Sequence, residues 1–120
     1  MFIVTVYNFI QSLSYNVIVK KEGDFYDYIT IVGLRYYFGN EVFRVGQRLL
    51  IEKDIDNEED DEAIRVISDA GVTFGYVANS VRTVARGCKS AGRIYDWFEK
   101  QTEIRIMFIL SDVVIASVEL

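Results

Sequence analysis

The residues best able to do chemistry lie in a short acidic run. Seven of the nine positions from Asp54 to Glu62 carry carboxylates. A calcium loop of the EF-hand type needs a glycine at its sixth position and a glutamate at its twelfth. Counted from Asp54, these positions hold Glu59 and Arg65. The spacing therefore predicts no metal site, and a solvated turn or a surface for a partner are the alternatives.

The rest of the composition excludes several other chemistries. Histidine is absent and Cys88 is the single cysteine, which excludes the usual zinc ligand sets and histidine-dependent nucleophilic catalysis. A lone thiol cannot form an internal disulfide, so we expect a reducing, cytoplasmic compartment. Cys88 lies beside Lys89, but without a base or a second thiol it is interpreted as a buried or incidental cysteine. We therefore predict a protein that is not an enzyme and has no cofactor.

A basic segment follows later in the chain. No carboxylate occurs between Asp69 and Asp96, and four cations are spaced by four, three and four residues: Arg82, Arg86, Lys89 and Arg93. Four cations on one surface can contact the phosphates of a nucleic acid. They can equally pair with the acidic run, within one chain or between two copies. The sequence leaves both interpretations open.

An aromatic segment supplies a third candidate site. Arg35-Tyr36-Tyr37-Phe38 ends a strand-like stretch just before Gly39. An exposed tyrosine beside an arginine offers a ring for base stacking and a cation for the backbone of a single strand. Ordinary packing of the strand against a core is the alternative.

The charge of the chain is unevenly distributed. The formal net charge is −5, and removing the seven carboxylates of the acidic run changes it to +2. An acidic protein repels polyanions at long range. Because the acidity is confined to one run, other surfaces keep the capacity to meet a nucleic acid.

Length and hydropathy indicate one domain. The chain has 120 residues, and 51% are hydrophobic, which is enough for a modest core. We expect residues 27–120 to form the main domain, with residues 1–26 as an N-terminal strand or lead-in that can belong to it. The apolar N-terminus lacks a basic start and the roughly 18–20 uninterrupted apolar residues of a membrane span, so no membrane association is predicted.

The periodicity predicts a mainly β protein with one or two short helices. Alternating β-branched residues and Gly-rich turns indicate about six to seven strands, at 15–20, 28–36, 48–53, 62–68 and 72–77, with one or two more at 103–110 and 113–118. Residues 2–7 fit either a short strand or the start of a helix that reaches Ser14. Serine caps and helical spacing indicate short helices at 81–86 and 91–100. Strands and helices do not alternate, so the sheet should be antiparallel. The predicted architecture is a small, partly closed β-barrel similar to an oligonucleotide-binding fold.

The order of these pieces resembles the HIRAN domain family. Gly33-Leu34-Arg35-Tyr36-Tyr37 is followed by a strand, then by a string of the form Asp-Asn-x-x-Asp-x-x-Ala-Ile-x-Val from Asp56 to Val66, then by Phe74-Gly75-Tyr76-Val77. The resemblance covers roughly residues 28–96. The remainder, through Ser90-Ala91-Gly92-Arg93, looks like the short free-standing bacterial members.

The resemblance implies a modified oligonucleotide-binding barrel that captures the free 3′ end of single-stranded DNA. Arg35, Tyr36, Asn57 and Asp60 match the family's strand-binding residues. Glu59 stands where the family has a stacking tyrosine, Tyr76 where it has a histidine, and Asn79 where it has a basic residue. The implied function is binding of single-stranded or damaged DNA by these residues, with help from the four cations. The alternative is a protein-interaction or self-association module in which the acidic run repels DNA.

Overall fold

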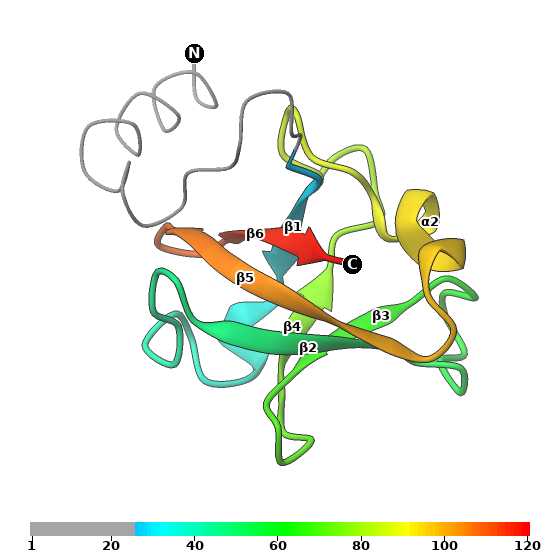
Figure 1. Cartoon of the computed structure of the whole chain (residues 1–120), viewed down its shortest axis with the longest axis horizontal. Coiled ribbons are helices and arrows are strands. Elements are labelled where there is room, and N and C mark those ends of the chain that lie inside the picture. The colour runs from blue at the N-terminus through cyan, green and yellow to red at the C-terminus, as the bar shows by residue number, and fades with distance from the viewer. Residues whose placement is uncertain (1–25) are drawn as a thin grey trace.

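Six strands in the described part of the chain form a closed antiparallel barrel. The computed structural model describes residues 26–120. The strands are β1 (Tyr28–Val32), β2 (Arg48–Lys53), β3 (Ile64–Ile67), β4 (Thr73–Val77), β5 (Gln101–Ile109) and β6 (Val114–Glu119) (Figure 1). Their order around the barrel is β1-β4-β3-β2-β5-β6, and β6 pairs back with β1. Closure leaves no free sheet edge among these strands, so the backbone of each is paired on both sides.

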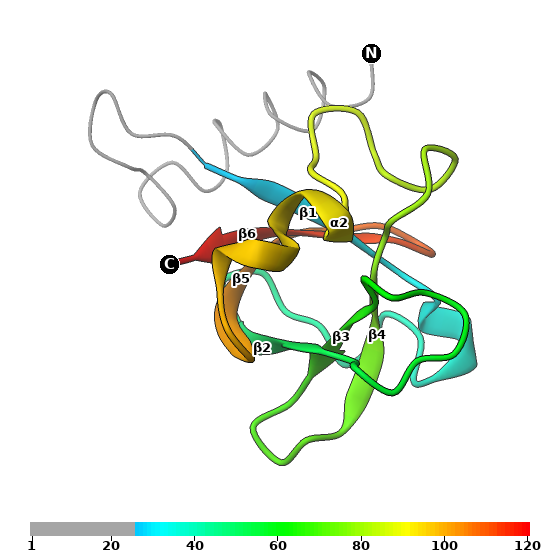
Figure 2. The same ribbon diagram turned by 90° about the vertical axis from the view of Figure 1, so that its right-hand side faces the viewer.

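Alternation along the strands builds the core. Ile29 and Ile31 of β1 and Ile104 and Ile106 of β5 are fully buried, because every second side chain of a barrel strand points inward. Burying one such side chain stabilises the fold by roughly 1.5–3 kcal/mol relative to leaving it exposed. The short helix α2 (Ala91–Ile94) lies across one opening of the barrel (Figure 2), and its two end residues belong to the same apolar cluster.

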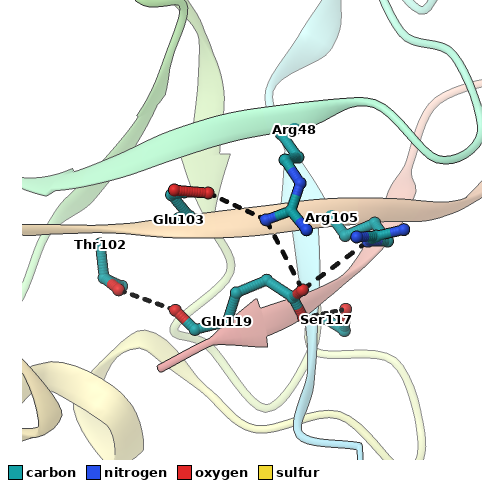
Figure 3. A network of polar contacts seen from close by, with 6 residues as sticks. All are labelled: Arg48, Thr102, Glu103, Arg105, Ser117 and Glu119. Carbon is teal, nitrogen blue, oxygen red and sulfur yellow. Dashed lines mark hydrogen bonds and ion pairs between the residues drawn. The ribbon is translucent and has the colours of Figure 1, made fainter. Parts of the chain in front are cut away.

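The outer face of β2, β5 and β6 carries a network of charges (Figure 3). Arg48 and Arg105 lie directly opposite each other on β2 and β5, an arrangement that repels by itself. The Glu119 carboxylate lies 3.9 Å from Arg48 and 3.7 Å from Arg105, and Glu103 lies 3.0 Å from Arg48. The carboxylates therefore bridge the two guanidinium groups and offset their repulsion.

The predicted fold class is confirmed, and the barrel closes completely. The strand at 48–53 is found with the predicted bounds. The predicted strand 28–36 is too long, because Gly33 has a φ of 76° and turns the chain into a 3₁₀ helix, η1 (Leu34–Tyr36). The strand predicted at 15–20, the strand or helix start predicted at 2–7, and most of the lead-in predicted at 1–26 lie outside the described residues.

Both predicted helices need correction. Residues 81–86 form turns and a bend, because hydrogen bonds tie this part of the chain to β1: the Ala85 N–H donates to the Thr30 side chain (Oγ1). Just after the segment, the Lys89 N–H donates to the Tyr28 carbonyl. The helix predicted at 91–100 is only α2 followed by a 3₁₀ helix, η2 (Tyr95–Trp97). The backbone is extended at Phe98, so the chain leaves the helix and enters β5 at residue 101. None of the helices in residues 26–120 has the length and apolar character needed to cross a membrane.

Candidate functional site

A hollow of about 480 Å³ gathers several of the predicted residues beside β4. Its polar lining comes from the turn after η1, from the acidic loop (residues 54–62) and from the first residues after β4. In Figure 2 this loop, drawn between β2 and β3, lies in front of β4 beside the η1 turn. Asn57, Asp60 and Tyr76 all line the hollow, although they are up to 19 residues apart in sequence. The fold therefore brings together three of the nine predicted site residues.

The acidic loop owes its shape to hydrogen bonds within it. Asn57 Oδ1 accepts from the backbone N–H groups of Glu59 (2.9 Å) and Asp60 (3.0 Å), and Asn57 Nδ2 donates to Asp54 Oδ2 (3.2 Å). Asp60 Oδ1 accepts from the backbone N–H of Glu62 (2.9 Å). Short polar side chains stabilise turns in this manner. Asn57 and Asp60 thus shape the loop through hydrogen bonds that need no ligand.

Two neutral side chains fasten this loop to the barrel. The Tyr76 hydroxyl donates to Asp54 Oδ2 at 2.6 Å, and this bond lowers the pKa of the Asp54 carboxyl. Burial, together with the same carboxylate, raises the pKa of Tyr76 well above its usual value, so the phenol stays neutral. Asn79 Nδ2 donates to the Asp60 carboxylate at 3.1 Å, and Asn79 Oδ1 accepts from the backbone N–H of Gly92 at 2.8 Å. Asn79 therefore connects the loop with α2.

The predicted pair Arg35–Tyr36 does not line the hollow, although Tyr37, the next residue in the chain, does. Arg35 Nη2 donates to the Tyr36 hydroxyl (2.9 Å), and its guanidinium carbon lies 5.0 Å from the centre of the Tyr36 ring. The Tyr36 side chain is 71% exposed. This pair presents a ring and a cation to solvent, which is the combination that single-stranded nucleic acids need.

From the sequence, Tyr37 is only a member of the aromatic segment and is not among the predicted site residues. It lines the hollow, and its ring centre lies 6.4 Å from that of Tyr76. The 3₁₀ helix ends at Tyr36, and Tyr37 after it has a non-helical backbone (φ −126°, ψ −110°); Tyr37 lines the hollow, whereas Tyr36 does not. The only sequence signal was the doubled tyrosine after Arg35, and it does not say which ring faces inward.

The predicted cations do not form one helical face. They lie on the irregular chain between β4 and α2 and on α2 itself, and their positions are Arg82, Arg86, Lys89 and Arg93. Lys89 Nζ lies 3.4 Å from Asp27 Oδ1, so this cation pairs with the residue before β1 rather than with the acidic loop. Ser80 and Thr83 of the same segment line the hollow. The segment therefore begins at the rim of the hollow, and Arg82 lies between two lining residues in sequence.

The lining of the hollow is rich in acceptors. Glu59 and Asp60 line it, and the described lining residues include no lysine or arginine. Within residues 26–120, no three His, Cys, Asp or Glu side chains gather in a way that could hold a metal ion. Burial raises the pKa of the Cys88 thiol, which makes it a poor nucleophile at neutral pH. The hollow is therefore a place for uncharged or hydrogen-bond-donating groups, and phosphates fit better beside the cations outside it.

Comparison with known proteins identifies a matching domain family and two crystal structures of similar fold. The family model of the HIRAN domain matches residues 25–96. The structure is similar to a crystal structure of a Lactobacillus plantarum protein (structural genomics target LpR91B), with a TM-score of 0.51 and 20% identity over 78% of this chain and 93% of that one. It is also similar to the crystal structure of the HIRAN domain of human HLTF, with a TM-score of 0.51 and 20% identity over 76% of this chain and 72% of that one. No curated protein matches the chain significantly.

These likenesses agree with the residue pattern. At 20% identity the two solved structures show a common fold. The family model spans more than half of the 120 residues and includes the η1 turn, the acidic loop and β4. The chain therefore belongs to the HIRAN domain family.

Proposed function

We propose that the chain is a non-enzymatic module that binds single-stranded DNA at free 3′ ends or at sites of damage. HIRAN domains are known in general for DNA binding. The observation that supports the proposal best is the hollow itself, where Asn57, Asp60 and Tyr76 converge beside the exposed pair Arg35–Tyr36. A strand end can enter the hollow while the backbone behind it crosses this pair.

The charges around the hollow suggest how an end would be distinguished. A terminal 3′-hydroxyl can donate a hydrogen bond to the Asp60 carboxylate, which has lone pairs beyond those used by Asn79 and the loop backbone. A terminal phosphate would meet Glu59 and Asp60 with like charge. Arg35, and Arg82 at the rim, would contact phosphates one or more nucleotides inside the strand.

Fluorescence anisotropy at low salt tests the proposal. The probes are 5′-labelled single strands that carry either a 3′-hydroxyl or a 3′-phosphate. We expect the hydroxyl form to bind more tightly, and Tyr36→Ala to weaken binding by about five- to a hundredfold, the usual cost of losing one stacked base. Removing one phosphate contact with Arg35→Ala should flatten the salt dependence by about 0.7 in the logarithmic slope.

A matched control separates local effects from the loss of any cation. Arg105→Ala removes a guanidinium from β5, which lies opposite β4 in the ring of six strands, and should leave affinity unchanged. Absence of binding at tens of micromolar refutes the proposal. Equal affinity for strands with a 3′-hydroxyl and a 3′-phosphate refutes only the part of the proposal that concerns recognition of 3′ ends.

A protein-interaction or self-association module is the second candidate. The observation that favours it is that Asn57 and Asp60 are already engaged in the loop's own hydrogen bonds, beside a carboxylate-rich lining. Such a surface suits a basic partner or the basic segment of a second copy. An apparent mass in size-exclusion chromatography that falls with added salt, or a partner retained after nuclease treatment, would favour this candidate.

A further inference from the structure

The family resemblance does not identify an aromatic side chain in the hollow on which a DNA base could stack. The position where the resemblance expects a loop tyrosine holds Glu59, which has no aromatic face. Tyr36 is outside the hollow beside Arg35. Two rings line the hollow, and Tyr76 is tied to Asp54 by its hydroxyl. Tyr37, with 40% of its side chain exposed, is the ring that a ligand can reach.

The backbone around Tyr37 is held in place by a hydrogen-bonded turn. Gly33 begins the turn with a φ of 76°, and the N–H groups of Tyr37 and Gly39 both donate to the Leu34 carbonyl, at 3.0 Å and 2.9 Å. Leu34 is buried in the core, so the turn is anchored to the barrel. The Tyr76 ring then supports Tyr37 at a centroid distance of 6.4 Å. A ring held in this manner loses little conformational entropy when a base stacks on it.

The acceptors opposite determine which edge of a base can face them. Glu59 and Asp60 accept hydrogen bonds and repel phosphate, and the described lining offers no cation to balance them. The exocyclic amino groups of cytosine and adenine are donors, and carboxylates commonly accept from the cytosine amino group. Thymine presents carbonyl oxygens at the corresponding position. A base with an amino edge therefore suits this lining better than thymine.

We infer that Tyr37 is the ring on which one unpaired base stacks inside the hollow, with the amino edge of the base toward Glu59 and its phosphates outside. The inference rests on the proposed function and deepens it, because it names the nucleotide group that enters the site. It also separates two neighbouring tyrosines: Tyr37 holds the base within the hollow, and Tyr36 contacts the strand outside.

Anisotropy with Tyr37 variants tests this assignment. Tyr37→Ala should weaken binding of a strand ending in 3′-dC by about ten- to a hundredfold, whereas Tyr37→Phe, which keeps the ring, should stay within about twofold of the unchanged protein. Strands ending in dC or dA should bind several-fold more tightly than strands ending in dT. Thermal unfolding of each variant shows whether a loss of binding reflects a loss of fold.

Photocrosslinking keeps the test independent of any substitution. A strand with 5-iodocytosine at its 3′ terminus, bound at saturating protein and irradiated, should crosslink to Tyr37 in the unchanged protein, as identified by peptide mapping. If the unchanged protein binds no strand, the proposed function and the inference fall together. If it binds but Tyr37→Ala binds equally well, or the crosslink maps elsewhere, the assignment of Tyr37 is wrong and the proposed function stands. Equal affinity for dC and dT ends overturns the amino-edge orientation.

Discussion

Removing the Tyr76 hydroxyl should loosen the acidic loop and destabilise the fold in a pH-dependent manner. In Tyr76→Phe the ring that packs beside Tyr37 is kept, while the 2.6 Å hydrogen bond to Asp54 is lost. A hydrogen bond to a charged group contributes about 1.5–3 kcal/mol when it is well buried. This bond is only partly buried, so we expect the free energy of unfolding at pH 7 to fall by about 1–2 kcal/mol.

The pH dependence has a definite sign. The Tyr76 hydrogen bond lowers the pKa of Asp54 in the folded protein, whereas the unfolded chain has an ordinary aspartate pKa of about 3.9. The extra stability is therefore fully present above about pH 4–5 and is lost as the pH falls through the lower folded pKa. The difference between the unchanged protein and Tyr76→Phe should be large at pH 7 and clearly smaller near pH 2.

Urea unfolding at both pH values measures these differences. The control is Tyr36→Phe, which also removes one tyrosine hydroxyl, but from an exposed bond with Arg35. Surface changes of this kind usually stay within about 0.5 kcal/mol. A Tyr76→Phe variant as stable as the unchanged protein at pH 7, or one destabilised equally at pH 2 and pH 7, would refute the role given to the ionised Asp54.

Three further changes test the barrel and its loop. Gly75→Ala would place a Cβ 2.8 Å from the Val32 carbonyl oxygen of β1, so β1 and β4 must separate, and a thermal scan should reveal a loss of about 1–3 kcal/mol. Asn79→Ala removes the link between the acidic loop and α2; urea unfolding should show a loss of about 1–3 kcal/mol, and amide exchange should accelerate in residues 54–62. Glu119→Ala leaves the two arginines that it bridges facing each other (Figure 3), and its cost, up to about 1 kcal/mol, should shrink in high salt.

The strand pattern was readable from the sequence because it depends on local alternation. Arg48–Lys53 places the apolar residues Leu49 and Ile51 at alternate positions, where both are buried, and its bounds are confirmed. The helix predicted at 81–86 failed for the opposite reason. The conformation of this part of the chain depends on hydrogen bonds to Thr30 and Tyr28, about 55 residues away. Helix propensity, which is a local property of the sequence, cannot predict such distant contacts. Tertiary contacts overrode a weak local preference.

Only those residues of the candidate site that match the family pattern could be predicted from the sequence. Asn57 and Asp60 belong to the family's Asp-Asn-x-x-Asp string and Tyr76 to the family segment that follows it, and the fold gathers all three at one hollow. Tyr37 was missed because its direction is set by the left-handed Gly33 and the 3₁₀ turn that follows. A sequence shows two adjacent tyrosines, but only the turn geometry separates an inward ring from an outward one.

The manner in which the acidic loop is held has a consequence for ligand binding. The hydrogen bonds that fasten it come from neutral groups, Tyr76 and Asn79, so they fix its position without cancelling its charge. A DNA strand that contacts Arg35 and Arg82 would release counterions and bind more weakly as salt rises. Salt also screens the repulsion between the strand and the loop, over a Debye length of about 10 Å at 0.1 M. These effects oppose each other, so the salt dependence should be shallower than the number of phosphate contacts implies, and neutralising Glu59 with glutamine should steepen it.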